Sequence, residues 1–390
     1  MKNIESSFLQ LMRIALGNAA TLDAPLSAEE WEELFDMSTK HGVSGIAFSG
    51  VEKLPKEQMP PLEVIMDWSA VAEYIEEVNR HQNSVSVKVC DAFERDGVRA
   101  CIVKGASVGV LYPEPLRRNA GDVDVWMSGG YEAVAEYARK RFPYFHGGHY
   151  GRHIEVTADG VQVEIHFMPA ELYSFQHRIH LKALYREIEA KAWMRRVELK
   201  GSGSIIVPEL EETLIIVIVH LFSHFAVEGV GMKQVLDCYW VLKEVGKADA
   251  GKGADTEGMV DKKGMADTEG KPVGGKSADE TREWAMSFFR KVGIGKFVAA
   301  LMYVLQQLGL EERLMLCAPD EKWGKRLLDD IMDKGVVSVD VLVDGKYGAE
   351  NKASRFFRRL SRAVRMLPMA PSEMLWMLQS GISYWLSRKG

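Results

Sequence analysis

The segment RNAGDVDVWM, residues 118–127, places two carboxylates one residue apart inside an otherwise apolar run. If this run forms a strand, the alternation of side chains puts Asp122 and Asp124 on one face and the intervening valine on the other. Two carboxylates at this spacing repel each other unless a cation lies between them. Because Mg²⁺ prefers oxygen ligands of this type, the pair is a candidate metal site. Taken alone, the pair also fits a solvent-facing edge strand or an Asx turn before a helix.

A third carboxylate is indicated by the segment HIEVTADGVQVEIHF, which alternates polar and apolar residues on both sides of Asp159-Gly160. An Asp-Gly pair between two such runs predicts a hairpin with a two-residue turn. In that register apolar residues meet apolar ones, and Glu155 lies opposite Glu164. Like charges in this position are unfavourable, and a nearby metal, lysine or arginine would relieve the repulsion. We expect Glu164 to join the two aspartates on one polar face of the sheet.

A candidate phosphate site lies in the segment IVKGASVGVLY. An apolar strand that ends at Lys104-Gly105 and turns into a helix would present free backbone N–H groups, which attract phosphate. Gly105 permits a close approach, and Lys104 adds a positive charge. Turns of this type also occur in many proteins that bind no ligand there.

The elements that must position these residues lie in a chain of 390 residues, which is longer than one hydrophobic core usually supports. Short strands alternate with helical segments only in the middle of the chain, and helical periodicity dominates elsewhere. The expected fold class is therefore α+β, with a mixed sheet embedded in a mostly helical chain. The expected regions are an N-terminal helical region at 1–95, a catalytic core at 96–200, a helical region packing on the core at 205–247, a disordered low-complexity insert at 248–282, and a C-terminal helical region with a basic tail at 283–390.

The insert is rich in Gly, Lys and Asp, repeats ADTEG at 254 and 266, and lacks the apolar groups needed to offset ordering entropy. The formal net charge of -6 excludes a global basic field for nucleic acid. The four cysteines are scattered, which is typical of a reducing compartment. The longest apolar run, Thr213 to Phe222, is about half a membrane span and is expected to be a buried helix. With no secretory signal at the N-terminus, we expect a cytoplasmic protein without a transmembrane segment.

Three segments together resemble a bacterial family of uncharacterised nucleotidyltransferases in the DNA polymerase β-like superfamily. They are VKGASVGVLYPEPLRRNAGDVDVWM, VQVEIHF and HLFSHFAVEGVGMKQVLDCYWVL. The resemblance covers roughly residues 30–240, and more weakly the helices after 283. The residues that match the family pattern are Lys104-Gly105, Arg118 with Asp122 and Asp124, Glu164 with His166, and His220, His224 and Asp237. The wider superfamily has Gly-Ser after its first strand, where this chain has Lys-Gly.

The resemblance implies a nucleotidyltransferase-type fold and a two-metal reaction. An NMP would pass from an NTP, expected to be ATP, to an unidentified hydroxyl acceptor with release of pyrophosphate. Asp122 and Asp124 would hold Mg²⁺ (or Mn²⁺), and Glu164 would complete the catalytic metal site. Two alternatives are a non-catalytic nucleotide- or RNA-binding module with the same fold and an interaction domain with an incidental acidic face.

The resemblance also implies roles for the neighbouring cationic and histidine residues. Lys104 and the amides of Gly105 and Ala106 would cradle phosphate, and Arg118 would help to neutralise it. His166 would support a metal-binding carboxylate, or would only fill the polar face.

Several further residues are compatible with more than one role. His220 and His224 share a helix face, where they would contact the nucleotide or acceptor, or simply pack in the core. Lys233 and Asp237 are spaced for a helix ion pair. His146, His149 and His153 are expected in a Gly-opened loop beside the active site or at a metal. The basic, aromatic tail around 355–365 suits an anionic membrane, nucleic acid, or a docked helix whose arginines extend to the surface.

Overall fold

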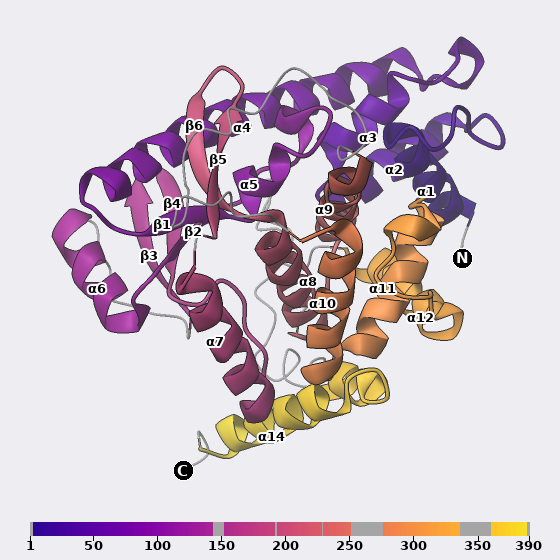
Figure 1. Ribbon diagram of the computed structural model, residues 1–390. Coiled ribbons are helices and arrows are strands. Elements are labelled where there is room, and N and C mark those ends of the chain that lie inside the picture. Colours follow the sequence, from indigo (N-terminus) through magenta and orange to yellow (C-terminus); the bar gives the residue numbers. More distant parts are fainter. Residues whose placement is uncertain are drawn as a thin grey trace.

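The computed structural model describes residues 3–142, 152–191, 193–227, 229–250, 276–335 and 360–387. Helices dominate this part of the chain, and a small mixed sheet lies among them, as the sequence predicts (Figure 1). The α+β fold class is therefore confirmed. Of the insert expected at 248–282, residues 248–250 end helix α9 and residues 278–282 begin helix α10, whereas 251–275 lie outside the described residues, as do His146 and His149.

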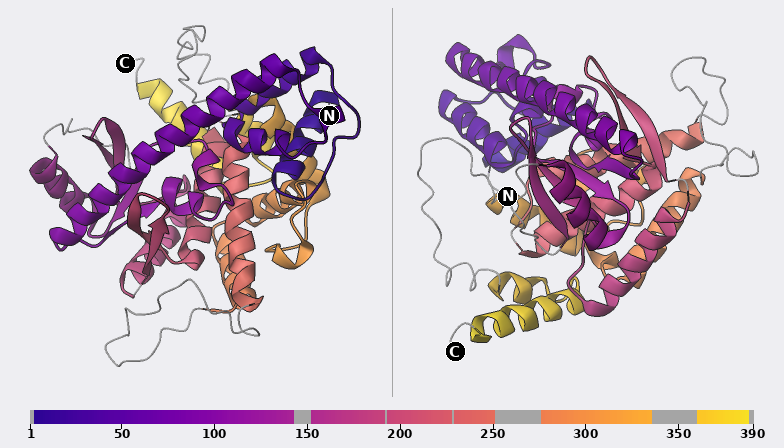
Figure 2. Two further views of the ribbon diagram at one scale, coloured as in Figure 1. Left: turned by 90° about the horizontal axis from the view of Figure 1, so that it is seen from above. Right: turned by 90° about the vertical axis from the view of Figure 1, so that its left-hand side faces the viewer.

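Helices occupy both ends of the chain and flank the strands. The α-helices are α1 (Asn3–Ala15), α2 (Ala28–Lys40), α3 (Ser44–Val51), α4 (Leu62–Arg95), α5 (Gly105–Gly109), α6 (Gly130–Arg141), α7 (Phe175–Glu189), α8 (Leu210–Val227), α9 (Met232–Ala250), α10 (Ala278–Lys291), α11 (Gly295–Gln307), α12 (Glu321–Lys334) and α14 (Pro371–Ser387). Short 3₁₀ helices are η1 (Lys56–Gln58), η2 (Pro115–Arg117) and η3 (Glu312–Leu314). The 34-residue α4 is about 50 Å long and extends along one side of the molecule (Figure 2).

The main sheet has the strand order β1-β2-β4-β3. Its strands are β1 (Ala100–Val103), β2 (Val123–Met127), β3 (His153–Ala158) and β4 (Val161–His166), and a separate hairpin joins β5 (Met194–Leu199) to β6 (Gly203–Pro208). β2 pairs antiparallel with β1 and parallel with β4. The predicted hairpin register of β3 and β4 is confirmed at every pair, from Ala158 with Val161 to His153 with His166. Positive φ angles at Asp159 and Gly160 give the twist that such a two-residue turn requires.

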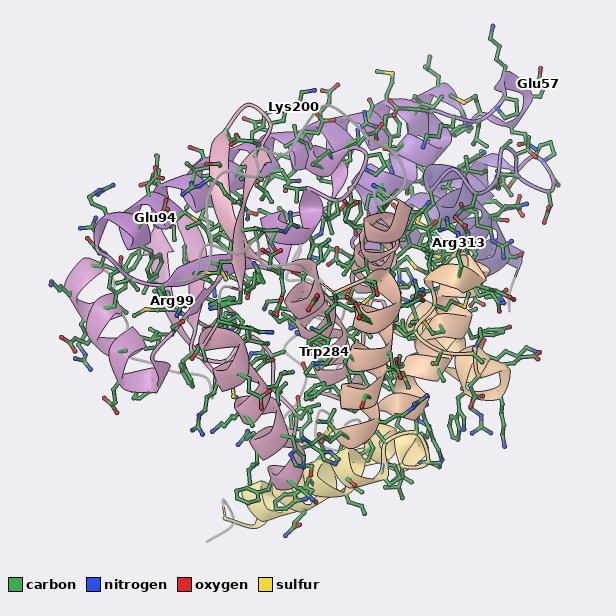
Figure 3. All side chains as sticks on the ribbon, viewed as in Figure 1. Glu57, Glu94, Arg99, Lys200, Trp284 and Arg313 are labelled. Carbon is green, nitrogen blue, oxygen red and sulfur yellow. The ribbon has the colours of Figure 1, made fainter. Side chains whose placement is uncertain are left out.

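The two faces of the sheet pack against different helices. The face that carries Val123 and Val125 shares a core with α4 and α6. The opposite face contributes Cys101, Val103 and Trp126 to a larger core that includes α8 and α9. Glu94 near the end of α4 and Arg99 just before β1 mark where the helical region leads into the sheet (Figure 3). Because Asp122 and Asp124 alternate with the valines, they face the α8 and α9 side.

Helix α8 is buried, as predicted for the apolar run Thr213 to Phe222. It is the only helix among the described residues that is long and apolar enough to cross a membrane, and 72% of that stretch is buried inside the protein. Such burial is typical of a core helix.

The basic tail is described only from residue 360 onward. Arg362 is 1% exposed, donates to both Asp330 oxygens at 2.9 and 2.6 Å, and lies over the Phe225 ring. Arg362 is therefore unavailable to a membrane or nucleic acid, which corrects that expectation for this residue. Arg355, Arg358 and Arg359 lie outside the described residues.

Candidate functional site

Three carboxylates meet on the sheet face that looks toward α8 and α9. Asp124 pairs with Glu164 across the parallel strands β2 and β4, and Asp122 lies just before β2. One oxygen from each of Asp122, Asp124 and Glu164 lies within 4.8 Å of the others. Asp124 is buried, whereas Asp122 is exposed. The site thus opens to solvent at Asp122.

Lys104 lies beside these acids in an unusual backbone conformation. Its φ of 55° and ψ of −148° are rare for a residue with a side chain, and Gly105 after it also has a positive φ. This turn directs the buried Lys104 ammonium into an ion pair with Asp124. Phosphate was the predicted partner of Lys104, but in this structure Asp124 compensates the charge of the Lys104 ammonium.

Two histidines complete the polar face. His166 is fully buried, and its Nε2 lies 2.6 Å from Asp124 Oδ1 and 3.2 Å from Glu164 Oε2. His153 lies between Glu155 and Glu164, at 3.6 and 3.4 Å. The repulsion between Glu155 and Glu164 was expected to be relieved by a metal, a lysine or an arginine. In the structure, the His153 ring lies near both carboxylates instead. His153, Glu164 and His166 are also close enough to share a metal ion.

The pKa values of the three acids diverge, as is common at functional sites. The charge of Asp124, followed by partial desolvation of the Asp122 carboxyl by neighbouring protein atoms and by the charge of Glu164, raises the pKa of Asp122 to about 7. Burial acts to raise the pKa of Asp124, but Lys104 and His166 outweigh it and hold that pKa well below its usual range. Burial also acts to raise the pKa of Glu164, but the hydrogen bond from His166 outweighs burial and lowers this pKa to about 2.

Asp122→Asn is expected to stabilise the metal-free protein at pH 8 but not near pH 4. The folded pKa of Asp122, about 7, is above its unfolded value of 3.8, so the native state binds the extra proton between these values. The free energy of unfolding of the wild type therefore falls as the pH rises through this window. Asparagine carries no charge, so the variant does not lose this stability. Melting temperatures in EDTA at pH 5 and pH 8 measure the effect.

The matched control is Asp159→Asn. Asp159 is exposed, and a hydrogen bond from Lys88 lowers its pKa. This variant should not gain stability at the higher pH. If the advantage of Asp122→Asn does not grow between pH 5 and pH 8, the carboxylates do not repel each other as described.

Arg118 has a different partner from the one predicted. Its Nε and Nη2 donate to the two oxygens of Asp237 on α9 at 2.7 and 2.8 Å, and the Tyr112 hydroxyl donates to the same carboxylate at 2.7 Å. All three side chains are buried. The expected ion pair of Asp237 with Lys233 is therefore wrong, because a bidentate guanidinium occupies the carboxylate. Arg118 lies beside the site with its charge already compensated.

Two cavities reach Asp122. A small one of about 30 Å³, large enough for about one water, is bordered by Gly105, Ala106 and Arg118 among others. An open cleft of about 400 Å³ lies between α4 and the β3–β4 turn. It is lined by Val78, His81, Gln82, Gly121, Asp122, Gly160, Val161 and Gln162. The larger cleft is within the range of small-molecule sites.

Two amide side chains of α4 hold the segment before Asp122. Asn79 donates to the carbonyls of Leu116 and Arg118, both at 2.7 Å, and Gln82 donates to the carbonyl of Gly121. Sequence reasoning missed these residues because their partners are backbone atoms far along the chain.

Helix α8 places His220 and His224 toward the acids, with ring centroids 4.4 Å apart. Burial, with Lys104 next, lowers the pKa of His220 well below its usual value. Burial and then Arg152 lower the pKa of His224 to about 4. Both rings are thus neutral at pH 7. Arg152, just before β3, was also missed by sequence reasoning.

Comparisons with known proteins identify a family for most of this chain. A family described as uncharacterised nucleotidyltransferase matches residues 27–254. The crystal structure of an antigenic nucleotidyltransferase-like protein from Paracoccidioides brasiliensis is similar at 13% identity, over 44% of this chain and 77% of that chain, with a TM-score of 0.27. A search of curated protein sequences found no match.

Proposed function

The chain belongs to the uncharacterised nucleotidyltransferase family, and from this premise we propose that it moves an NMP from an NTP to a hydroxyl acceptor. The reaction releases pyrophosphate and depends on a divalent metal. The observation that carries the proposal is the group of three carboxylates within 4.8 Å on one sheet face. ATP is the proposed donor.

The donor set suits the proposed ions. Asp122, Asp124 and Glu164 offer only carboxylate oxygens, which fit Mg²⁺ or Mn²⁺. When bound, such ions would stabilise the attacking and leaving oxygens of the transfer. Family membership supports nucleotidyl transfer, and the acid group supports its metal dependence.

The surrounding side chains set the charge and the orientation of these acids. Lys104 and His166 keep Asp124 ionised at neutral pH, and His166 also orients Glu164. Asp122, with its raised pKa, would lose its proton as a cation binds, so binding would release protons. The open cleft beside Asp122 is the proposed route for the nucleotide or the acceptor hydroxyl.

Isothermal titration with each NTP, with and without Mg²⁺, tests binding, and we expect binding only with the metal. Incubation with α-labelled NTPs and cell extract then tests transfer. Label should appear on an acceptor with the wild type and disappear with the double variant Asp122→Ala, Asp124→Ala. The matched control, Glu73→Ala with Glu77→Ala, removes two exposed carboxylates from α4.

The outcomes separate the alternatives. Binding of Mg²⁺–NTP without any transfer would indicate a non-catalytic nucleotide-binding module. If the Asp122, Asp124 double variant binds Mg²⁺–ATP like the wild type, the metal assignment is wrong. If no NTP binds, the proposed function is wrong.

A further inference from the structure

The cations nearest the acids are largely committed to partners within the protein. Lys104 is paired with Asp124, and Arg118 is held by Asp237. Neither carries a free charge toward an incoming ligand. An NTP tail brings several negative charges to a site that already holds three carboxylates, so a further cation beside the proposed metal ions would favour its binding.

Lys233, in the first turn of α9, is partly buried and makes no side-chain hydrogen bond or ion pair with the residues that the structure describes. Its ammonium lies 3.8 Å from the position that a Cβ on Gly121 would occupy. Gly121 directly precedes Asp122 and borders both cavities. The ammonium therefore lies beside Gly121, at the border of both cavities, and outside ion-pair distance of the acids.

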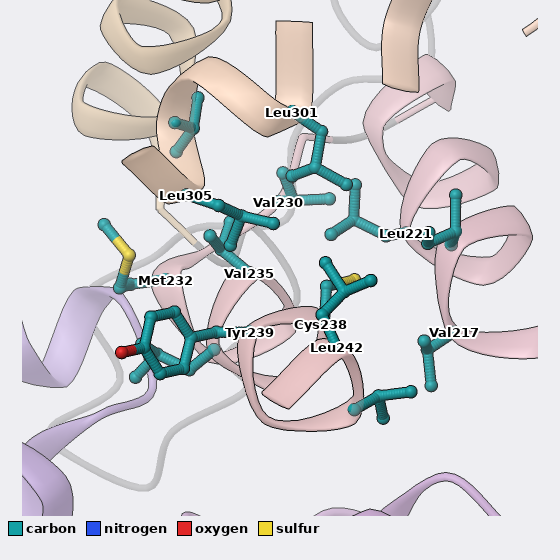
Figure 4. Close-up of a cluster of buried hydrophobic side chains, with 14 of the residues drawn as sticks. Val217, Leu221, Val230, Met232, Val235, Cys238, Tyr239, Leu242, Leu301 and Leu305 are labelled. Atoms are coloured by element: carbon teal, nitrogen blue, oxygen red, sulfur yellow. The ribbon is translucent and has the colours of Figure 1, made fainter. Parts of the chain in front are cut away.

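The position of Lys233 is fixed by the packing of α9. Met232, directly before it, and Val235, two residues after it, are fully buried, and the helix packs through further apolar side chains against α8 and α11 (Figure 4). The backbone N–H of Lys233 donates to the carbonyl of His41 at 3.3 Å. Its side chain is thus held near the site by its neighbours rather than by a salt bridge.

We infer that Lys233 binds the polyphosphate tail of the nucleotide, an inference that rests on the proposed function. A partly buried ammonium without a partner is unfavourable, and burial and Arg118 lower the pKa of Lys233 accordingly. An anionic ligand would remove this cost. Lysine is a common phosphate ligand because it acts as a compact point charge. The nearby carboxylates of Asp122, Asp124 and Glu164 would hold the metals of the same triphosphate.

Lys233→Met is expected to weaken binding of Mg²⁺–ATP by about 10- to 100-fold, the usual effect of losing a charge-assisted hydrogen bond. Binding of AMP and adenosine should change less than about threefold, because they lack the β- and γ-phosphates. Isothermal titration of ATP, ADP, AMP and adenosine provides the series. Lys233→Arg should recover part of the affinity for ATP.

Two controls distinguish binding from folding. Lys247→Ala removes an exposed lysine from the same helix and should leave all four affinities unchanged. Without ligand, Lys233→Met should melt no lower than the wild type, because the free ammonium contributes no ion pair.

Three outcomes would overturn the inference. Equal ATP affinities of wild type and Lys233→Met would assign the phosphate to other cations, such as Arg152. An equal loss of affinity for ATP and for adenosine, or unfolding of Lys233→Met, would show that Lys233 has a structural role. In each case Mg²⁺–ATP would still bind the wild type, whereas failure of the proposed function would abolish wild-type binding itself.

Discussion

Replacing Asp124 with asparagine is expected to reduce nucleotidyl transfer by at least about 10³-fold. Asp124 is the central acid of the site, because its carboxylate lies near those of Asp122 and Glu164 and contacts both Lys104 and His166. Asparagine keeps the shape of the side chain but removes the negative charge that a divalent ion requires. The rate of labelled NMP transfer measures the loss, and Mn²⁺ binding followed by electron paramagnetic resonance should weaken with it.

A loss of stability must be separated from this loss of chemistry. Asp124→Asn leaves the buried Lys104 ammonium without its carboxylate, which is costly. The double variant Lys104→Met, Asp124→Asn should therefore recover stability without recovering transfer. Asp91→Asn, at an exposed position of α4, is the isosteric control and should retain wild-type activity. A rate for Asp124→Asn within tenfold of the wild type would exclude it as a metal ligand.

The sheet was predictable where local pattern determines structure. Strand alternation places Asp122 and Asp124 on one face, and the Asp159-Gly160 turn sets the register that carries Glu164. Both signals act over a few residues, so they are readable from sequence. The placement of Asp124 beside Glu164 also requires the parallel pairing of β2 with β4, which no local pattern in the sequence predicts.

The partners of the charged residues were not predictable in the same way. Lys104, Arg118 and Asp237 each have a partner more than ten residues away in the sequence. Helical spacing favoured Lys233 for Asp237, but Arg118 offers two parallel hydrogen bonds and Tyr112 adds a third. A tertiary bidentate contact thus outweighs a local ion pair of a few tenths of a kcal/mol. This choice leaves the Lys233 ammonium without a side-chain partner.

The second large effect is expected for the Arg118–Asp237 pair. Arg118→Met should lower the free energy of unfolding by about 3–5 kcal/mol, because it leaves the buried Asp237 carboxylate without its cation. Arg118 lies four residues before Asp122, whereas Asp237 is on α9 with Lys233. The pair therefore joins the segment that carries the acids to the helix that carries Lys233. Urea denaturation followed by circular dichroism measures the change.

An exposed ion pair provides the reference for this effect. Arg196 contacts Glu94 at the surface, and Arg196→Met should cost no more than about 1 kcal/mol. The double variant Arg118→Met, Asp237→Leu should recover much of the lost stability, since it removes both buried charges. It should nevertheless weaken Mg²⁺–ATP binding, because the acids and Lys233 would no longer be held at a fixed separation. Recovery of both stability and binding would show that the pair is dispensable and that strand packing alone positions the site.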